Sequence, residues 1–157
     1  MAEHLILDLK SGPVKVALLT DVAPNHVTRI KELAGQGFYD GVVFHRVIPG
    51  FMAQTGDPTG TGSGGSDLPD LKAEFSATPH KRGTVSMART SNPNSANSQF
   101  FICFDDASWL DRQYSVWGEV VEGMEHVDAI KKGGENNNGA ISGEPDKILK
   151  ARVEADG

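Results

Sequence analysis

The chain has 157 residues, which is enough for one domain with a sizeable hydrophobic core and too few for two. Fifteen Lys and Arg against 21 Asp and Glu give a formal net charge of −6, so no general basic surface is available to neutralise nucleic acid or anionic lipid. Apolar residues make up 38% of the chain, and no apolar run approaches the length of a membrane span. We therefore expect a globular domain without nucleic-acid or membrane partners. We also expect a monomer, although nothing in the composition decides the oligomeric state.

The cysteine content and the N-terminal residues indicate the cellular compartment of the protein. The single cysteine, Cys103, cannot form an internal disulfide, and the N-terminus has neither the basic nor the apolar region of a secretory signal. These features predict a cytoplasmic protein. Cys103 lies inside the apolar segment Gln99–Phe104, which favours an inert buried thiol over a catalytic nucleophile.

Strand patterns outnumber helix patterns along the chain. The first twenty residues predict a hairpin of His4–Lys10 and Pro13–Thr20, and a helix follows that starts at Asp21–Pro24 and ends at Gly35. A second helix is predicted at Met124–Lys132, where apolar residues recur every three positions before two glycines. The other apolar runs predict strands at Val42–Val47, Phe51–Gln54, Thr84–Ala88, Ser98–Phe104, Ser115–Val121 and Lys147–Ala155.

Many short strands with only two helices predict a mainly β domain that occupies residues 1–157. Its antiparallel sheet should be closed or nearly closed on itself, with the helices covering the open ends. The loops at 56–70, 89–98 and 133–146 are long and polar. Because long loops in compact domains are usually functional, we expect the site to lie beside some of them.

Two motifs fail on inspection. The segment Gly60–Gly65 satisfies G-x-G-x-x-G, but Ser66–Asp70 after it cannot open a helix, and the Lys-Ser/Thr of a phosphate-binding loop is missing. We expect instead a mobile loop whose glycines adopt positive φ. The five histidines show no metal-ligand spacing and are interpreted as ordinary surface or packing residues.

Two segments are too unusual to be generic: Phe44–Gln54, FHRVIPGFMAQ, and Ser98–Ile102, SQFFI, which Trp109–Asp111 follows closely. Together they resemble the cyclophilins. The similarity continues, in order, through the segments at 37–41, 56–62, 82–88 and 118–124, so it covers most of the chain.

The resemblance implies a peptidyl-prolyl cis–trans isomerase built on a closed eight-stranded antiparallel β-barrel capped by two α-helices. Its substrates would be proline-containing peptides and unfolded or folding proteins, and the inhibitor cyclosporin would contact the indole of Trp109. No metal and no cofactor are implied. By resemblance the catalytic residues are Arg46 and Gln54, and the substrate-binding residues are Phe51, Met52, Ala88, Arg89, Thr90, Gln99, Phe101, Trp109, Leu110 and Tyr114.

Rotation about an Xaa-Pro bond is slow because amide resonance must be broken in a twisted transition state. No covalent bond is made or cleaved, so the enzyme needs a dry pocket for the proline ring and a donor aimed at the nitrogen. Arg46 fits the donor role, because its hydrogen bond strengthens as the nitrogen lone pair localises. Phe51, Met52, Phe101 and Leu110 fit the pocket.

Two positions depart from the common family pattern. Arg89 stands where many members have Asn, and Tyr114 where many have His, a combination that resembles a bacterial branch. Two other hypotheses stay open: a cyclophilin-fold module that binds proline peptides with little turnover, and a nucleotide-binding protein that uses residues 60–65.

Overall fold

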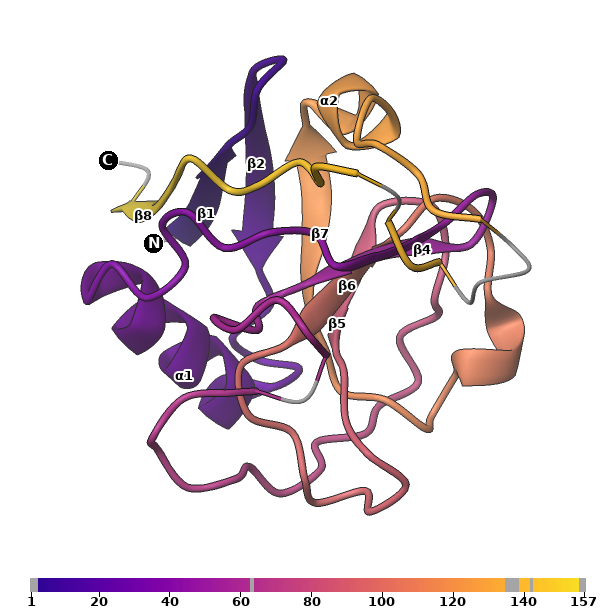
Figure 1. Cartoon of the computed structure of the whole chain (residues 1–157). Helices are drawn as coiled ribbons and strands as arrows, with labels where there is room; N and C mark the ends of the chain where they lie inside the picture. Colours follow the sequence, from indigo (N-terminus) through magenta and orange to yellow (C-terminus); the bar gives the residue numbers. More distant parts are fainter. Residues whose placement is uncertain (1–2, 63, 135–138, 142, 156–157) are drawn as a thin grey trace.

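The computed structural model describes residues 3–62, 64–134, 139–141 and 143–155 as one curled antiparallel sheet with two α-helices (Figure 1). The strands are β1 (Glu3–Asp8), β2 (Pro13–Leu18), β3 (Arg46–Ile48), β4 (Met52–Thr55), β5 (Thr84–Met87), β6 (Phe100–Cys103), β7 (Val116–Glu122) and β8 (Lys150–Ala155). The helices are α1 (Pro24–Gly35) and α2 (Met124–Asp128), with a 3₁₀ turn, η1, at Ser108–Leu110.

The sheet is an open, strongly curled half-barrel, which corrects the predicted closed barrel. Its strand order is β3-β4-β6-β5-β7-β2-β1-β8, so β3 and β8 are edges. The segments that precede these two edges meet only through isolated pairing, in which Phe44 N donates to Asp146 O at 2.8 Å and Ile148 N to Val42 O at 2.9 Å. Because this pairing forms no continuous ladder, the strand predicted at Val42–Val47 begins only at Arg46.

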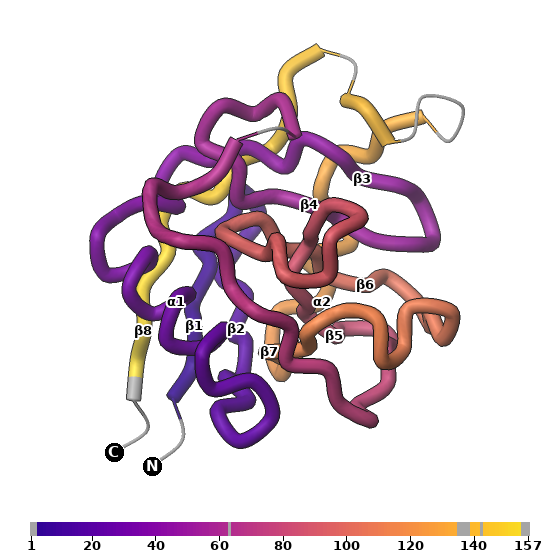
Figure 2. Tube along the Cα trace, turned by 90° about the horizontal axis from the view of Figure 1, so that it is seen from below, coloured from indigo at the N-terminus to yellow at the C-terminus, as the bar shows by residue number. Residues whose placement is uncertain are grey.

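The two predicted helices are confirmed; both contribute to the core and they lie at opposite ends of the curled sheet (Figures 1 and 2). Helix α1 packs against β7 and β8, whereas α2 packs against β2. Helix α2 ends at Asp128, earlier than predicted, because the backbone after it bonds to other segments. Lys131 N donates to the Asp146 carboxylate at 2.7 Å, and Gly133 N donates to Val47 O at 2.8 Å.

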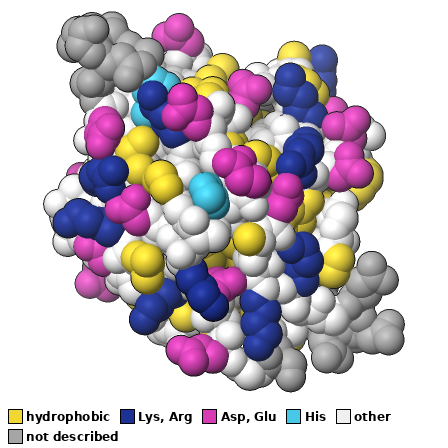
Figure 3. Space-filling view, turned by 90° about the horizontal axis from the view of Figure 1, so that it is seen from above, with side chains coloured by type: hydrophobic (Ala, Val, Ile, Leu, Met, Phe, Trp, Pro, Cys, Tyr) yellow, Lys and Arg dark blue, Asp and Glu magenta, His cyan; other side chains and the backbone are white. Residues whose placement is uncertain are grey.

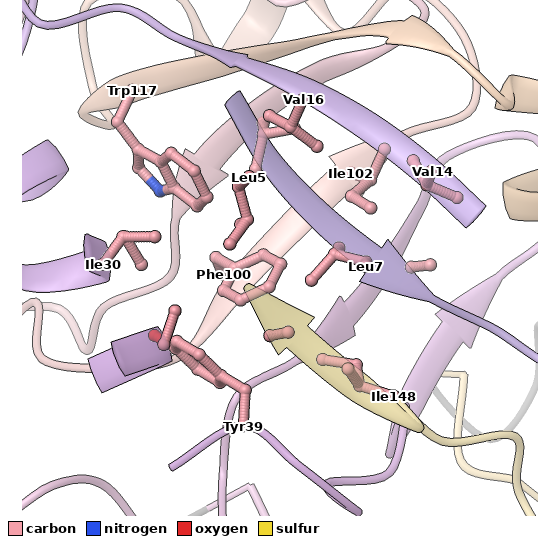
Figure 4. Packing of buried hydrophobic residues seen from close by; sticks show 14 of the residues in the cluster. Leu5, Leu7, Val14, Val16, Ile30, Tyr39, Phe100, Ile102, Trp117 and Ile148 are labelled. Carbon is pink, nitrogen blue, oxygen red and sulfur yellow. The ribbon is translucent and has the colours of Figure 1, made fainter. Parts of the chain in front are cut away.

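The main core fills the concave side of the sheet, and Phe100 lies at its centre (Figure 4). The rings of Tyr39 and Trp117 meet Phe100 edge-to-face at centroid distances of 5.4 and 5.3 Å. A second, smaller cluster of buried residues lies apart from this core and consists of Met52, Phe101, Cys103, Ala107 and Leu110. Strands β5 and β6 therefore have both faces covered, which explains why every residue of both strands is buried and why β6 is apolar throughout.

On the surface, acidic and basic side chains are interspersed over the face shown in Figure 3. In the described ranges, no helix combines the length and the apolar character needed to cross a membrane.

A close backbone approach next to the predicted site gives a stability prediction. Gly56 follows β4 with φ +96°, and a Cβ there would lie 2.4 Å from Ser98 O. Gly41 also has positive φ, at +79°, but has no atom within 4 Å of such a Cβ. We expect Gly41→Ala to lower the free energy of unfolding by about 1 kcal/mol and Gly56→Ala by about 3 kcal/mol, since only Gly56→Ala adds a clash. Urea denaturation measures both, and equal losses would contradict the close approach.

Candidate functional site

Strand register places three predicted site residues in one row. Arg46 on β3 lies opposite Gln54 on β4, and Gln54 lies opposite Phe101 on β6. Side chains of directly opposed residues share a face of the sheet, while the neighbouring residues point to the other face. The adjacent row, Val47, Ala53 and Ile102, is buried in the main core. The site therefore lies on the convex face, opposite the core.

A small cavity of about 110 Å³ opens at this row. Nine of the twelve predicted site residues line it: Arg46, Phe51, Met52, Gln54, Ala88, Arg89, Phe101, Leu110 and Tyr114. We call it the ring cavity. Its apolar walls come from the second buried cluster, and its polar rim comes from Arg46, Gln54 and Arg89.

A larger cavity of about 550 Å³ adjoins the ring cavity and shares Gln54, Ala88 and Arg89 with it. We call it the groove. Thr90 and Gln99 line the groove, whose walls come from the two predicted functional loops 56–70 and 89–98. Trp109 lines neither cavity. It is 62% exposed, with its ring 5.6 Å from that of Phe51.

A chain of hydrogen bonds connects the two cavities. Arg46 Nη1 donates to Gln54 Oε1 at 3.1 Å, and Gln54 Nε2 donates to Gln99 Oε1 at 2.9 Å. Gln99 Nε2 in turn donates to the carbonyls of Gly62 and Gly64 at 3.0 and 2.9 Å. Burial lowers the pKa of Arg46, but a guanidinium keeps its proton in proteins. The site thus holds a fixed cation beside an apolar cavity.

The glycine-rich wall of the groove is organised by Asp57, which sequence reasoning missed. Its buried carboxylate accepts hydrogen bonds from the backbone N–H groups of Thr59, Gly62 and Gly64 at 2.8, 2.6 and 3.0 Å. Burial opposes ionisation of Asp57, but these hydrogen bonds outweigh it and hold its pKa well below the usual range. Gly60 and Gly62 have the expected positive φ. An aspartate at the start of a Gly/Thr-rich loop is the signal that could have identified this role.

His80 supports the ring cavity from behind. Its ring stacks on Phe101 with centroids 6.1 Å apart, and it meets Tyr114 edge-on at 6.3 Å. Nδ1 lies 3.1 Å from the Asp111 carboxylate and Nε2 lies 3.0 Å from Ser86 Oγ, so the neutral tautomer protonated at Nδ1 satisfies both contacts. His80 is thus a buried packing histidine. Its role has no local sequence signal, because Asp111 lies 31 residues away.

Other side chains near the site are inert. Cys103 is buried as predicted, and burial raises the pKa of its thiol to about 12. Within the described part of the chain, no group of three or more His, Cys, Asp or Glu side chains is arranged to hold a metal ion.

Burial of histidines gives a pH prediction. Burial lowers the pKa of His80 below 6.5, and Asp111 opposes this shift only in part; His26 and His45 also have lowered values. Below about pH 6.5 the unfolded chain therefore binds protons that the native state does not, so the free energy of unfolding falls as the pH falls. We expect His80→Gln to reduce this slope by up to about 1.4 kcal/mol per pH unit. Urea denaturation between about pH 7.5 and pH 5.5 tests it, with His126→Gln on α2 as control; an unchanged slope in His80→Gln would contradict the assignment.

The comparisons with known proteins agree with this geometry. The family described as "Cyclophilin type peptidyl-prolyl cis-trans isomerase/CLD" matches residues 4–153. A protein of Brucella suis named "Probable peptidyl-prolyl cis-trans isomerase" is 58% identical over 163 residues, covering 97% of this chain and 83% of the relative.

Solved structures give the same result. A cyclophilin from Hirschia baltica superimposes with a TM-score of 0.82 at 30% identity, covering 94% of this chain and 72% of the other. A Cryptosporidium parvum cyclophilin crystallised in the presence of the dipeptide Ala-Pro gives a TM-score of 0.89 at 27% identity, covering 98% and 99%. Family match, identity and fold agree, so the chain belongs to the cyclophilin-type peptidyl-prolyl cis–trans isomerases.

Proposed function

We propose that the ring cavity holds the proline ring of a peptide substrate while Arg46 donates a hydrogen bond to the prolyl nitrogen as the amide twists. The observation that carries this proposal is that Arg46 and the apolar side chains of Phe51, Met52, Phe101 and Leu110 line the same cavity. An apolar protein cavity of about 150 Å³ is known to bind benzene, so a cavity of about 110 Å³ suits a five-membered ring.

Arg46 acts on the transition state because the lone pair of a planar amide nitrogen is delocalised and cannot accept a hydrogen bond. Twisting the Xaa-Pro bond ends the resonance and localises that lone pair. The interaction then stabilises the twisted state more than either planar isomer, which is the requirement for catalysis. No proton is transferred and no covalent intermediate forms.

A single donor does not supply the whole effect. An acceleration of about 10⁵-fold needs about 7 kcal/mol, whereas removing one preorganised donor typically costs about 3–4 kcal/mol. The remainder is assigned to exclusion of water from the ring cavity and to positioning of the peptide in the groove. Gln54 and Gln99 contribute to both the ring cavity and the groove, because their hydrogen bonds link Arg46 to the groove wall.

The alternative function is a binding module with little turnover. Such a module needs only the apolar cavity, whereas here a positive charge is held at the cavity rim by the Gln54 amide, which favours the enzyme. We infer that the substrates are proline-containing segments of unfolded or folding proteins in the cytoplasm. Cyclosporin is a proposed inhibitor, since the exposed Trp109 ring lies 5.6 Å from that of Phe51, which lines the ring cavity.

The first test removes the donor. Arg46→Ala should lower kcat/KM for a short Ala-Pro peptide by roughly 100- to 1,000-fold, the typical effect of deleting one preorganised donor. The cis-to-trans relaxation rate measures it. Arg152→Ala on β8 is the matched control, because Arg152 pairs with Asp8 and Glu154 away from both cavities. Wild-type turnover in a folded Arg46→Ala protein would exclude the proposed role.

The second test concerns titration. Arg46 stays charged, burial lowers the pKa of His80, and the mechanism transfers no proton, so turnover of an uncharged peptide should be nearly flat between about pH 6 and pH 8. Tyr114→Phe should keep most activity, because its ring packs edge-to-face on Phe101 at 5.6 Å and the change removes only the hydroxyl. A bell-shaped wild-type profile, or a loss in Tyr114→Phe as large as in Arg46→Ala, would reveal a missing proton-carrying or hydrogen-bonding group.

A further inference from the structure

Arg89 lies where the ring cavity and the groove meet, and it lines both. Its guanidinium is 4.6 Å from the centre of the Tyr114 ring. Nε and Nη2 donate to Gln113 O at 3.1 and 2.7 Å, and Nη1 donates to Thr90 O at 2.9 Å. The charged group is therefore fixed at this junction before a peptide binds.

The charge of Arg89 is not neutralised by these contacts. All of its acceptors are backbone carbonyls, and among the described residues Arg89 forms no ion pair, whereas Arg82 and Arg152 each pair with carboxylates. A guanidinium has five N–H donors, and these three hydrogen bonds use three of them. Two donors remain for a ligand, on a planar group whose geometry suits a carboxylate.

The direction of the substrate decides which residue meets Arg89. In the proposed mechanism the prolyl nitrogen faces Arg46, and that nitrogen carries the residue that precedes proline. The groove adjoins the ring cavity and shares Gln54, Ala88 and Arg89 with it, so we infer that the residues preceding proline extend into the groove. The residue immediately before proline then passes the junction at Arg89. Asp70 lines the groove but not the ring cavity, so we place its carboxylate beside peptide residues farther from the proline.

We propose that Arg89 is a specificity-determining residue that favours substrates with Asp or Glu immediately before the proline. The inference rests on the proposed function and adds a substrate class to it. The advantage is local, because the chain as a whole carries a net charge of −6 and repels acidic peptides. One residue farther from the proline, Asp70 removes the advantage.

The test compares matched peptides by NMR exchange: acetyl-Ala-Glu-Pro-Phe-amide, the same peptide with Gln, and acetyl-Glu-Ala-Pro-Phe-amide with its own Gln counterpart. At low ionic strength we expect kcat/KM to be about three-fold higher for Glu-Pro than for Gln-Pro, the size of an exposed charge pair. Added salt should bring the ratio towards one. The Glu-Ala-Pro peptide should show no advantage over Gln-Ala-Pro.

Variants assign the effect to one side chain. Arg89→Gln should abolish the advantage of Glu over Gln, and Arg89→Lys should retain part of it. Lys150→Gln on β8 is the control, because it removes one positive charge away from both cavities and should leave the advantage unchanged. A ratio of one in the wild type, or an equal ratio in wild type and Arg89→Gln, overturns the proposal while isomerase activity stands. Absence of acceleration on every peptide would overturn the proposed function as well.

Discussion

The register of four neighbouring strands is the constraint on which the site depends. Across β3, β4, β6 and β5, one row of opposed residues faces the core, namely Val47, Ala53, Ile102 and Val85, and the adjacent row faces the site, namely Arg46, Gln54, Phe101 and Ser86. A slip of one residue would exchange the two faces. Burying Val47 or Ile102 contributes about 1.5–3 kcal/mol, so core packing selects the register that aligns the arginine, the glutamine and the aromatic ring.

Around this row, buried and partly exposed polar groups hold side chains and a loop that the strand pairing does not fix. Ser86 and Asp111 hold the ring of His80, which supports Phe101. Asp57 fixes the loop whose carbonyls hold Gln99. Each polar group is thereby satisfied by hydrogen bonds, as burial requires. Preorganisation of this kind lets a donor act on a twisted amide without first reordering its surroundings.

The sequence predicted most of the strands and the residues of the ring cavity, and it failed where long-range contacts decide. The pattern of Phe100 to Cys103 marks a strand covered on both faces, because apolar runs of that length have few other interpretations. The prediction of a closed barrel was wrong. Closure depends on whether the segments near Phe44 and Asp146 pair continuously, and apolar periodicity carries no information about that pairing. His80 was missed for the same reason, because its partner Asp111 lies 31 residues away. Asp57 differs, since its partners Thr59, Gly62 and Gly64 follow it closely in the sequence and its local signal was overlooked.

Two arginines border one cavity, and their effects on catalysis differ because their contacts form at different stages. The proposed contact of Arg46 requires a localised lone pair, so it exists only when the amide is twisted and raises kcat. A carboxylate at Arg89 would be bound equally in the planar and the twisted states. Uniform binding of that kind lowers KM without raising kcat. The selectivity proposed for Arg89 would therefore lower KM. It would let the groove favour one class of sequence without changing the rotation that Arg46 is proposed to accelerate.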